Sequence, residues 1–437
     1  MRLPCALPAL LAGMIFFTAC GGGAGTSQGP PSDVAITVSP TSFTMGVGSN
    51  FQFIAAVTGA NNQSVTWQVN GVEGGDSIHG TITAAGLYVA PATAVSGITV
   101  TAVANADTSK TADASVSLTS PDPMGTAQAS GITCKQGKVN ANSSCYSVDL
   151  SCPGIADFTA YVKVTHPTGT AQGTVMLTGG GNGNGFYEDY TFGDTTVNNI
   201  VAGGFIAVQT TFGGPFTNQT PNGWQTGPGG IRRLACRYAT LATWVYANVH
   251  NSSTTRPMCA TGNSSGGQLI AETLTHYGTD SIFAMVEPTS GPPFSDMQKA
   301  CICGSNASTP VTGACGGSLK VNQCLGVDDA QKYVDPAYSS PICSQDVQSQ
   351  STANQSEFIS DSVQSPEAQV NYPHTYMRFL YGGTDTSSAV TLGPDYMHTV
   401  TSQKSQACVA DAPHSIADVL DGAEQIASDI IANCKLH

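Results

Sequence analysis

The chain reads RPMCATGNSSGGQLIAETLT from residue 256 to residue 275, and this stretch decides the fold. Its first part is short and apolar and opens with a proline, which is typical of a buried parallel strand. Glycines follow, and the apolar residues Leu269, Ile270 and Leu274 then recur at helical spacing. The pattern predicts a strand, a sharp turn that carries Ser264, and a helix.

The Gly-x-Ser-x-Gly pattern around Ser264 predicts a nucleophile. On such a turn the serine hydroxyl stands clear of the sheet above a helix N-terminus. Only small neighbours fit there, and Gly262, Gly266 and Gly267 provide them. The same pattern around Ser27 has no strand or helix pattern beside it, so we expect no chemistry there. The alternative for Ser264 is a strand-to-helix turn without chemistry.

Length and charge limit the possible functions. The 437 residues are enough for two domains, and the formal net charge is −14 with only 15 Lys and Arg. Such a chain has no basic patch for nucleic acid or for anionic lipid headgroups. We therefore expect no nucleic-acid partner.

Residues 1–20 have the pattern of an export signal, with an arginine, an apolar run too short to span a bilayer, and small residues before Cys20. The segment resembles a bacterial lipoprotein signal, and the resemblance implies that Cys20 is the lipid attachment site. The alternative is ordinary signal cleavage near the same point. We expect a protein that is lipid-anchored to the bacterial cell envelope, at the outer membrane or cell surface, or secreted. Its membrane contact is expected only through this N-terminal anchor.

Of the 14 cysteines, Cys5 and Cys20 lie in the signal region, and all others follow residue 130. An even number in an exported domain predicts up to six disulfides, whose pairing the sequence leaves open. The alternative for Cys301, Cys303 and their neighbours is a metal site, but no histidine lies nearby. We expect neither a metal nor a cofactor.

Residues 34–119 alternate between apolar and polar residues in short runs separated by turns, which predicts a β-sandwich. The motifs at Ser39–Phe43, Val65–Val69 and Gly86–Pro91 resemble those of a bacterial immunoglobulin-like domain. The resemblance implies a spacer or adhesive module with Trp67 in its core.

Residues 127–437 alternate short apolar runs with helical patterns, which predicts an α/β domain with a doubly wound, mostly parallel sheet. We expect residues 21–33 to be a flexible tether before the sandwich and residues 120–126 to be the linker after it. The predicted strands are Phe158–Val164, Thr174–Leu177, Phe205–Val208, Met258–Thr261, Phe283–Val286, Tyr376–Tyr381 and Ala407–Ala410. Helices are expected over Ile231–Val249, after Ser264, and from about Ile416 to Ala432. With the Ser264 turn, this alternation resembles the α/β-hydrolase fold.

A serine nucleophile needs a base, and the base needs an orienting acid. In α/β hydrolases these groups follow in the order serine, acid, histidine. The resemblance implies Asp385, after the strand Tyr376–Tyr381, as the acid and His414, after the strand Ala407–Ala410, as the base.

Other residues compete for these roles. Other histidines also follow the serine, but His276 lies in the helix, His374 precedes a strand and His398 falls in a helical pattern. None of them lies on a loop after a strand. Asp395 and Asp411 remain alternatives for the acid, although Asp411 is close enough to the histidine to shape its turn instead.

The glycine-rich run at residues 178–185 follows the strand Thr174–Leu177, where hydrolases of this fold place the loop that stabilises the oxyanion. We expect the backbone amides of Gly180 or Gly181, together with that of Ser265, to form the oxyanion hole. The run lacks the lysine and the glycine order of a phosphate-binding loop, so no nucleotide is expected.

Two further features are expected near the site. Residues 290–370 are rich in cysteine, serine, proline and glutamine, interrupt the core, and are predicted to form a disulfide-pinned lid. Aromatic residues in the loops after two strands either line an acyl pocket or cover the end of the sheet: Phe186, Tyr187, Tyr190, Phe212, Phe216 and Trp224.

These residues predict an exported serine hydrolase that cleaves carboxylic esters, small or polymeric, through an acyl-enzyme intermediate. The chain resembles polyhydroxyalkanoate depolymerases and feruloyl or acetyl esterases. It departs from the tannase pattern, because Asn263 and Pro413 stand where that family has cysteines. The alternatives are a serine peptidase on the same fold and a surface-binding lipoprotein without catalysis.

Overall fold

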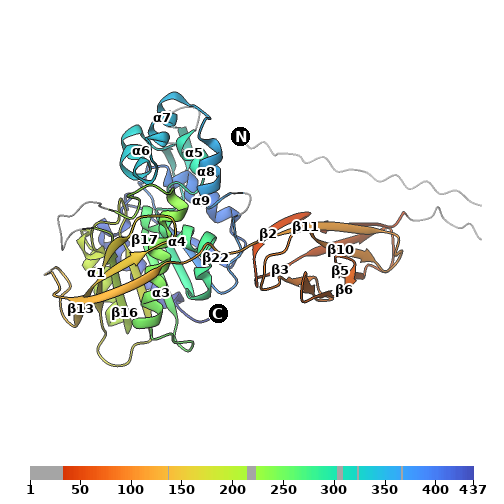
Figure 1. Cartoon of the computed structure of the whole chain (residues 1–437), viewed down its shortest axis with the longest axis horizontal. Helices are drawn as coiled ribbons and strands as arrows, with labels where there is room; N and C mark the ends of the chain where they lie inside the picture. The colour runs from red at the N-terminus through yellow and green to blue at the C-terminus, as the bar shows by residue number, and fades with distance from the viewer. Residues whose placement is uncertain (1–32, 136, 214–222, 303–308, 322–323, 366–367) are drawn as a thin grey trace, which may run out of the picture.

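The computed structural model describes residues 33–437 except 136, 214–222, 303–308, 322–323 and 366–367. Two groups of elements lie side by side (Figure 1), which we call the β domain (residues 35–119) and the α/β domain (residues 126–437). The expected signal segment with Cys20, and the tether except for its last residue, lie outside the described residues. Within the described part, no helix is long and apolar enough to cross a membrane.

The alternating runs of the β domain form short strands around one core. A five-stranded sheet has the order β2-β11-β10-β5-β6, a four-stranded sheet has the order β3-β9-β8-β7, and β1 pairs with β4. Trp67 and Tyr88 are buried in the core that the sheets share. The strands are β1 (Ala35–Ser39), β2 (Ser42–Gly46), β3 (Asn50–Gln52), β4 (Ile54–Thr58), β5 (Val65–Val69), β6 (Val72–Glu73), β7 (Gly75–Asp76), β8 (Gly80–Ile82), β9 (Leu87–Val89), β10 (Ile98–Ala104) and β11 (Thr111–Thr119).

The α/β domain is built on a nine-stranded sheet of order β12-β13-β14-β16-β15-β17-β18-β21-β22. Its strands are β12 (Thr126–Ile132), β13 (Ser143–Ser151), β14 (Phe158–Thr165), β15 (Gly173–Thr178), β16 (Phe205–Thr211), β17 (Met258–Asn263), β18 (Met285–Thr289), β21 (Tyr376–Gly382) and β22 (Lys404–Val409). Antiparallel pairs join β12, β13, β14 and β16, and all other neighbours are parallel. The expected doubly wound sheet is therefore present, but one edge of it is antiparallel.

Helices cover both faces of this sheet. α1 (Gly193–Ala202) and α10 (Leu420–Asn433) enclose one core, and α3 (Cys236–Asn248) and α4 (Ser265–Tyr277) enclose the other. The prediction of one helix over Ile231–Val249 was wrong in detail, because α2 (Ile231–Leu234) ends before α3 begins. Two short elements complete this part of the chain, η2 (Thr279–Ser281) and η4 (Ile416–Asp418), and α9 (Ala389–Thr399) follows β21.

The insertion between β18 and β21 places its helices beyond one end of the sheet (Figure 1). Its elements are α5 (Met297–Cys301), β19 (Thr309–Thr312), β20 (Ser318–Val321), α6 (Val327–Tyr333), η3 (Asp335–Ala337), α7 (Ile342–Ser349) and α8 (Gln355–Asp361). Because loops at the carboxyl ends of parallel strands meet at one edge, an insertion after β18 is well placed to cover a site there.

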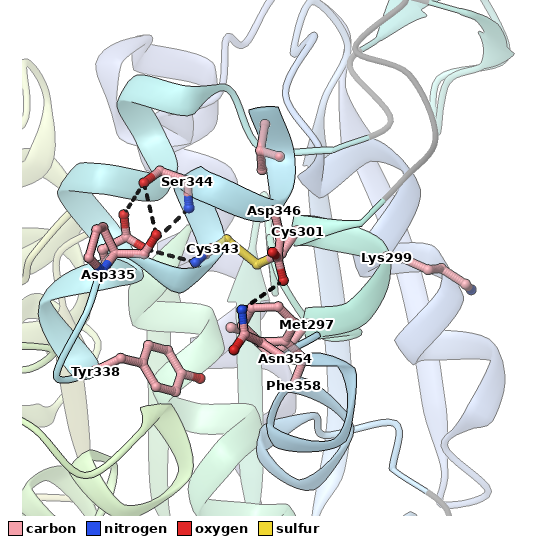
Figure 2. The surroundings of a disulfide bond; sticks show 12 residues. Met297, Lys299, Cys301, Asp335, Tyr338, Cys343, Ser344, Asp346, Asn354 and Phe358 are labelled. Atoms are coloured by element: carbon pink, nitrogen blue, oxygen red, sulfur yellow. Dashed lines mark hydrogen bonds between the residues drawn. A yellow bond between two sulfur atoms is a disulfide. The ribbon is translucent and has the colours of Figure 1, made fainter. Parts of the chain in front are cut away.

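The insertion is held together by a disulfide and a helix cap (Figure 2). The Cys301–Cys343 disulfide joins α5 to α7. The Asp335 carboxylate accepts hydrogen bonds from the backbone N–H groups of Cys343 (2.9 Å) and Ser344 (3.2 Å) in the first turn of α7. A carboxylate there satisfies N–H groups that have no partner within the helix. These contacts hold the helices of the insertion in place relative to one another.

Disulfides are confined to the α/β domain among the described residues. The pairs are Cys134–Cys145, Cys152–Cys236, Cys259–Cys434, Cys301–Cys343 and Cys315–Cys408. Cys324 is also disulfide-bonded, and Cys303 lies outside the described residues. Of the cysteines considered for a metal site, the described ones are thus in disulfides, and a disulfide sulfur is not the thiolate that ligates a metal: Cys301, Cys315, Cys324 and Cys343.

Candidate active site

Ser264 lies on the turn between β17 and α4 with φ 53° and ψ −117°. A residue other than glycine rarely adopts a positive φ, so the backbone is strained at this position. The turn also brings main chains into close approach. A Cβ at Gly262 would lie 2.5 Å from the carbonyl carbon of Gly266. The glycines of the motif are therefore required by packing, and they leave the serine on a tight elbow.

The loops after β21 and β22 bring Asp385 and His414 to Ser264. Ser264 Oγ lies 2.7 Å from Nε2 of His414, and Nδ1 of His414 lies 2.8 Å from Oδ2 of Asp385. A neutral imidazole that donates Nδ1–H to the carboxylate has Nε2 free to accept the serine proton. The three groups thus form one chain along which a proton can leave the serine.

Asp385 is charged at neutral pH although it is only 2% exposed. Burial raises the pKa of its carboxyl group, but hydrogen bonds from His414 and Ser387 outweigh burial and bring the pKa below its ordinary value. The backbone N–H of Ser387 donates to Oδ1 at 2.9 Å, and the Ser387 hydroxyl lies 3.0 Å from Nδ1 of His414. The sequence reasoning missed Ser387, because a serine two residues after an acid has no distinguishing pattern.

The competing residues lie elsewhere. His276 is buried in α4, with its Nε2 3.4 Å from Oε2 of Glu272. Asp395 pairs with Lys299 at 3.0 Å, and Asp411 is exposed in the turn after β22. None of these residues, nor His374 and His398, is among the described residues that line the cavity at Ser264.

The glycine-rich loop after β15 packs directly against the nucleophile. A Cβ at Gly180 would lie 3.1 Å from Cβ of Ser264, and Gly181 has φ 60°. The carbonyl oxygen of Gly181 accepts hydrogen bonds from the Ser265 hydroxyl and from Nε2 of Gln225, the latter at 3.1 Å. Ser265 is the first residue of α4, where backbone N–H groups have no helical partner. The structure therefore brings all three expected oxyanion-hole residues beside Ser264.

The amide of Gly180 is turned toward a side chain. Its N–H donates to the hydroxyl of Tyr190 at 2.7 Å. Tyr190 was predicted only as one of several pocket aromatics, and no sequence pattern links it to the glycine loop ten residues before it.

A cavity of about 680 Å³ opens at the serine and histidine. The insertion contributes Pro293, Phe294, Cys324, Leu325, Gly326, Asp329 and Tyr333 to its wall. Among the described residues that line it there is no lysine or arginine. The described part of the chain also holds no group of three or more His, Cys, Asp or Glu that could bind a metal ion.

Of the predicted pocket aromatics, Tyr190 lines the cavity. Three others are buried in the two cores of the α/β domain instead, namely Tyr187, Phe212 and Trp224, and Phe186 is also buried. Phe216 lies outside the described residues. Among the described rings, the interpretation of an acyl pocket is therefore supported for Tyr190 only.

No protein-family model matches the sequence, and no curated protein matches it. The solved structures similar to this chain include three hydrolases. Dienelactone hydrolase from Anabaena variabilis ATCC 29413 has 11% identity and a TM-score of 0.38, over 67% of this chain and 97% of that chain. An acetyl xylan esterase from Paenibacillus sp. R4 has 12% identity and a TM-score of 0.40, over 71% and 89%. Brefeldin A esterase, a bacterial homologue of human hormone-sensitive lipase, has 12% identity and a TM-score of 0.40, over 69% and 79%. Because these sequence identities and TM-scores are low, the chemistry has to be inferred from the residues of the site.

Proposed function

We propose that this protein is an exported serine esterase, with Ser264 as nucleophile, His414 as base and Asp385 as the orienting acid. The proposal is supported above all by the hydrogen-bonded chain from Asp385 through His414 to Ser264, with contacts of 2.8 and 2.7 Å. The strained turn at Ser264 and the cavity at its hydroxyl add to this support.

In the first half of the reaction, Ser264 Oγ attacks the ester carbonyl carbon while Nε2 of His414 takes the hydroxyl proton. The C–O bond to the alcohol then breaks, and His414 gives its proton to the departing alkoxide oxygen. Water repeats these steps on the acyl-enzyme and releases the acid. Asp385 stays ionised throughout and stabilises the charged imidazole.

The oxyanion of each tetrahedral intermediate needs preorganised donors. We assign this role to the backbone amides of Gly181 and Ser265, because both residues line the cavity together with Ser264. Gly180 lies in the same loop, but its own amide donates to Tyr190. Removing one such donor typically costs about 10²–10³-fold in rate.

The cavity favours uncharged esters, because its described lining has no lysine or arginine to pair with an anionic group. Export is supported by the disulfides of the α/β domain, since such bonds persist in oxidising compartments. In this proposal Cys20 carries the lipid anchor, and the β domain is an immunoglobulin-like spacer between the anchor and the enzyme.

The test is a screen of the purified protein against short-chain, aromatic and polymeric esters, and against peptides with leaving groups of equal size. We expect ester turnover that disappears in Ser264→Ala. Turnover of peptides alone would favour the peptidase alternative. A folded protein that turns over neither, and that does not react with a fluorophosphonate, would favour the binding lipoprotein.

A further inference from the structure

The hydroxyl of Tyr190 lies beside the nucleophile. Tyr190 follows the short helix η1 (Tyr187–Asp189) and forms part of the cavity wall. A Cβ built on Gly180 would lie 3.2 Å from Tyr190 Oη and 3.1 Å from Cβ of Ser264. The phenol oxygen and the serine therefore flank the same glycine.

This hydroxyl accepts one hydrogen bond from the protein and keeps a proton to donate. The Gly180 N–H donates to the phenol oxygen at 2.7 Å. A phenol hydroxyl carries one proton besides its acceptor lone pairs. Because Gly180 uses the hydroxyl as an acceptor and Tyr190 lines the cavity, the proton of Tyr190 is available to donate into the cavity.

The same surroundings keep that proton in place. Burial raises the pKa of Tyr190 to about 12, although the hydrogen bond from Gly180 opposes this shift. The phenol is therefore protonated at the pH values at which an esterase of this type works.

A buried ion pair fixes the turn that carries Tyr190. Lys163 Nζ lies 2.9 Å from Oε1 of Glu188 in η1, and the two side chains are 0% and 2% exposed. Gln209 donates to the same carboxylate at 2.9 Å and accepts from the backbone N–H of Glu188 at 2.8 Å. Buried ion pairs add little net stability, so conformational specificity is the better reason for one at this position.

A second set of bonds holds the other side of the turn. Lys138 Nζ donates to the carbonyl oxygen of Tyr190 at 2.7 Å. Thr191 donates through its N–H and its hydroxyl to Asp418, both at 2.9 Å. Asp418 ends η4, which follows the loop of His414. The phenol is thus held before substrate arrives, as a donor to a developing charge must be.

From this geometry we infer that Tyr190 is a catalytic residue whose hydroxyl donates a hydrogen bond to the oxyanion, together with the amides of Gly181 and Ser265. The inference rests on the proposed esterase function. It also gives the Gly180 amide a role, because the hydrogen bond that this amide donates to the phenol oxygen makes the phenol a better donor.

The first experiment compares Tyr190→Phe with the wild type on one ester. We expect kcat to fall about 10–10³-fold with KM nearly unchanged, since the lost bond forms only in the transition state. Tyr187→Phe is the matched control, because its ring packs against that of Tyr190 (centroids 5.1 Å apart) on the same turn. It should retain wild-type turnover. A folded Tyr190→Phe variant within twofold of the wild type would overturn the inference.

The second experiment distinguishes a Tyr190 hydroxyl that donates to the oxyanion from one that only holds Gly180 in place. 3-Fluorotyrosine at position 190 has a more acidic phenol, which is a better donor and a poorer acceptor. Turnover and affinity for a trifluoromethyl ketone, which forms an oxyanion on the serine, should stay equal or rise. A fall in both would mean that the hydroxyl only holds Gly180, and the inference would be wrong. Fluorophosphonate labelling of wild-type Ser264 is scored in parallel, because its absence would refute the esterase proposal itself.

Discussion

The two domains of this chain are stabilised in different ways. In the β domain (residues 35–119), Ser49 is the only buried polar side chain among the described residues, and the core is apolar. The α/β domain buries Lys163, Glu188, Glu272 and many other polar groups, and it holds every described disulfide. Apolar burial is non-directional, whereas a reactive site needs fixed polar groups that cost stability when they are buried. Disulfides offset part of that cost.

This contrast predicts that reductant and pH act on one domain and leave the other nearly unchanged. The largest effect is expected from reduction. Loss of a native disulfide typically costs about 2–5 kcal/mol, and a domain is stable by only about 5–15 kcal/mol. Full reduction should therefore unfold the α/β domain. Calorimetry with and without reductant should show one transition lost and the transition of the β domain unmoved. A shift of both transitions would contradict the predicted difference between the two domains.

The next largest effect concerns Asp385. Asp385→Asn should lower kcat about 10⁴-fold, because the imidazole of His414 loses its tautomer preference and the counter-charge for its protonated form. Asp411→Asn is the matched control, since Asp411 is exposed in the turn after β22. It should change the rate by less than about tenfold. Steady-state kinetics on one ester measure kcat for both variants. The reverse ranking of the two variants would mean that the acid is misassigned.

A third prediction concerns the buried pair beneath η1. Lys163→Met leaves the Glu188 carboxylate buried without its cation and should cost the α/β domain about 3–5 kcal/mol. The double variant Lys163→Met/Glu188→Leu should recover most of this loss, because no unpaired charge remains. Lys110→Met in the β domain is the control and should have little effect. Denaturant titrations measure all three, and a single variant as stable as the wild type would contradict this view of the pair.

The smallest effect is expected from pH. Burial raises the pKa of Asp280 to about 6. Between pH 3.8 and 6 the folded chain holds this proton while the unfolded chain releases it. The contribution of this group to stability is thus fully present below pH 3.8 and is lost as the pH rises through 6. Asp280→Asn should match the wild type at pH 4 and be more stable by about 1–3 kcal/mol at pH 7.5.

The control for this pH effect lies in the β domain. Asp107 is exposed, and hydrogen bonds from Ser109 lower its pKa. Its contribution has the opposite sign, since it is present above pH 3.8 and is lost as the pH falls below this value. Asp107→Asn should therefore gain no stability at pH 7.5. Thermal unfolding at the two pH values measures both variants, and equal gains in both would show that general charge reduction is responsible.

The elements that could be predicted from the sequence are those with a clear local pattern of residues. β5 runs over Val65–Val69 as its alternation indicates, and the strand, turn and helix around Ser264 follow from glycines and apolar spacing. Asp385 and His414 could be placed because chain order and strand ends restrict the choice. β12 was missed, since none of its residues is fully buried and its polar composition gives no core-facing pattern.

Contacts between residues that lie far apart in the chain could not be predicted from local patterns. A lysine in a strand predicts an exposed position, and Lys163 is buried only because Glu188 arrives from a turn 25 residues away. The role that we infer for Tyr190 likewise depends on Gly180 in the loop after β15 and on Asp418 at the end of η4. Such contacts become visible only when the chain is folded.

The central claim is that Ser264 is a nucleophile activated by His414. The most direct measurement is reaction with a fluorophosphonate, followed by intact mass and peptide mapping. We predict one adduct per chain, on the peptide that carries Ser264, absent in Ser264→Ala and formed far more slowly in His414→Ala. No adduct on the folded wild-type protein, or an adduct on another serine that persists in Ser264→Ala, would contradict the claim.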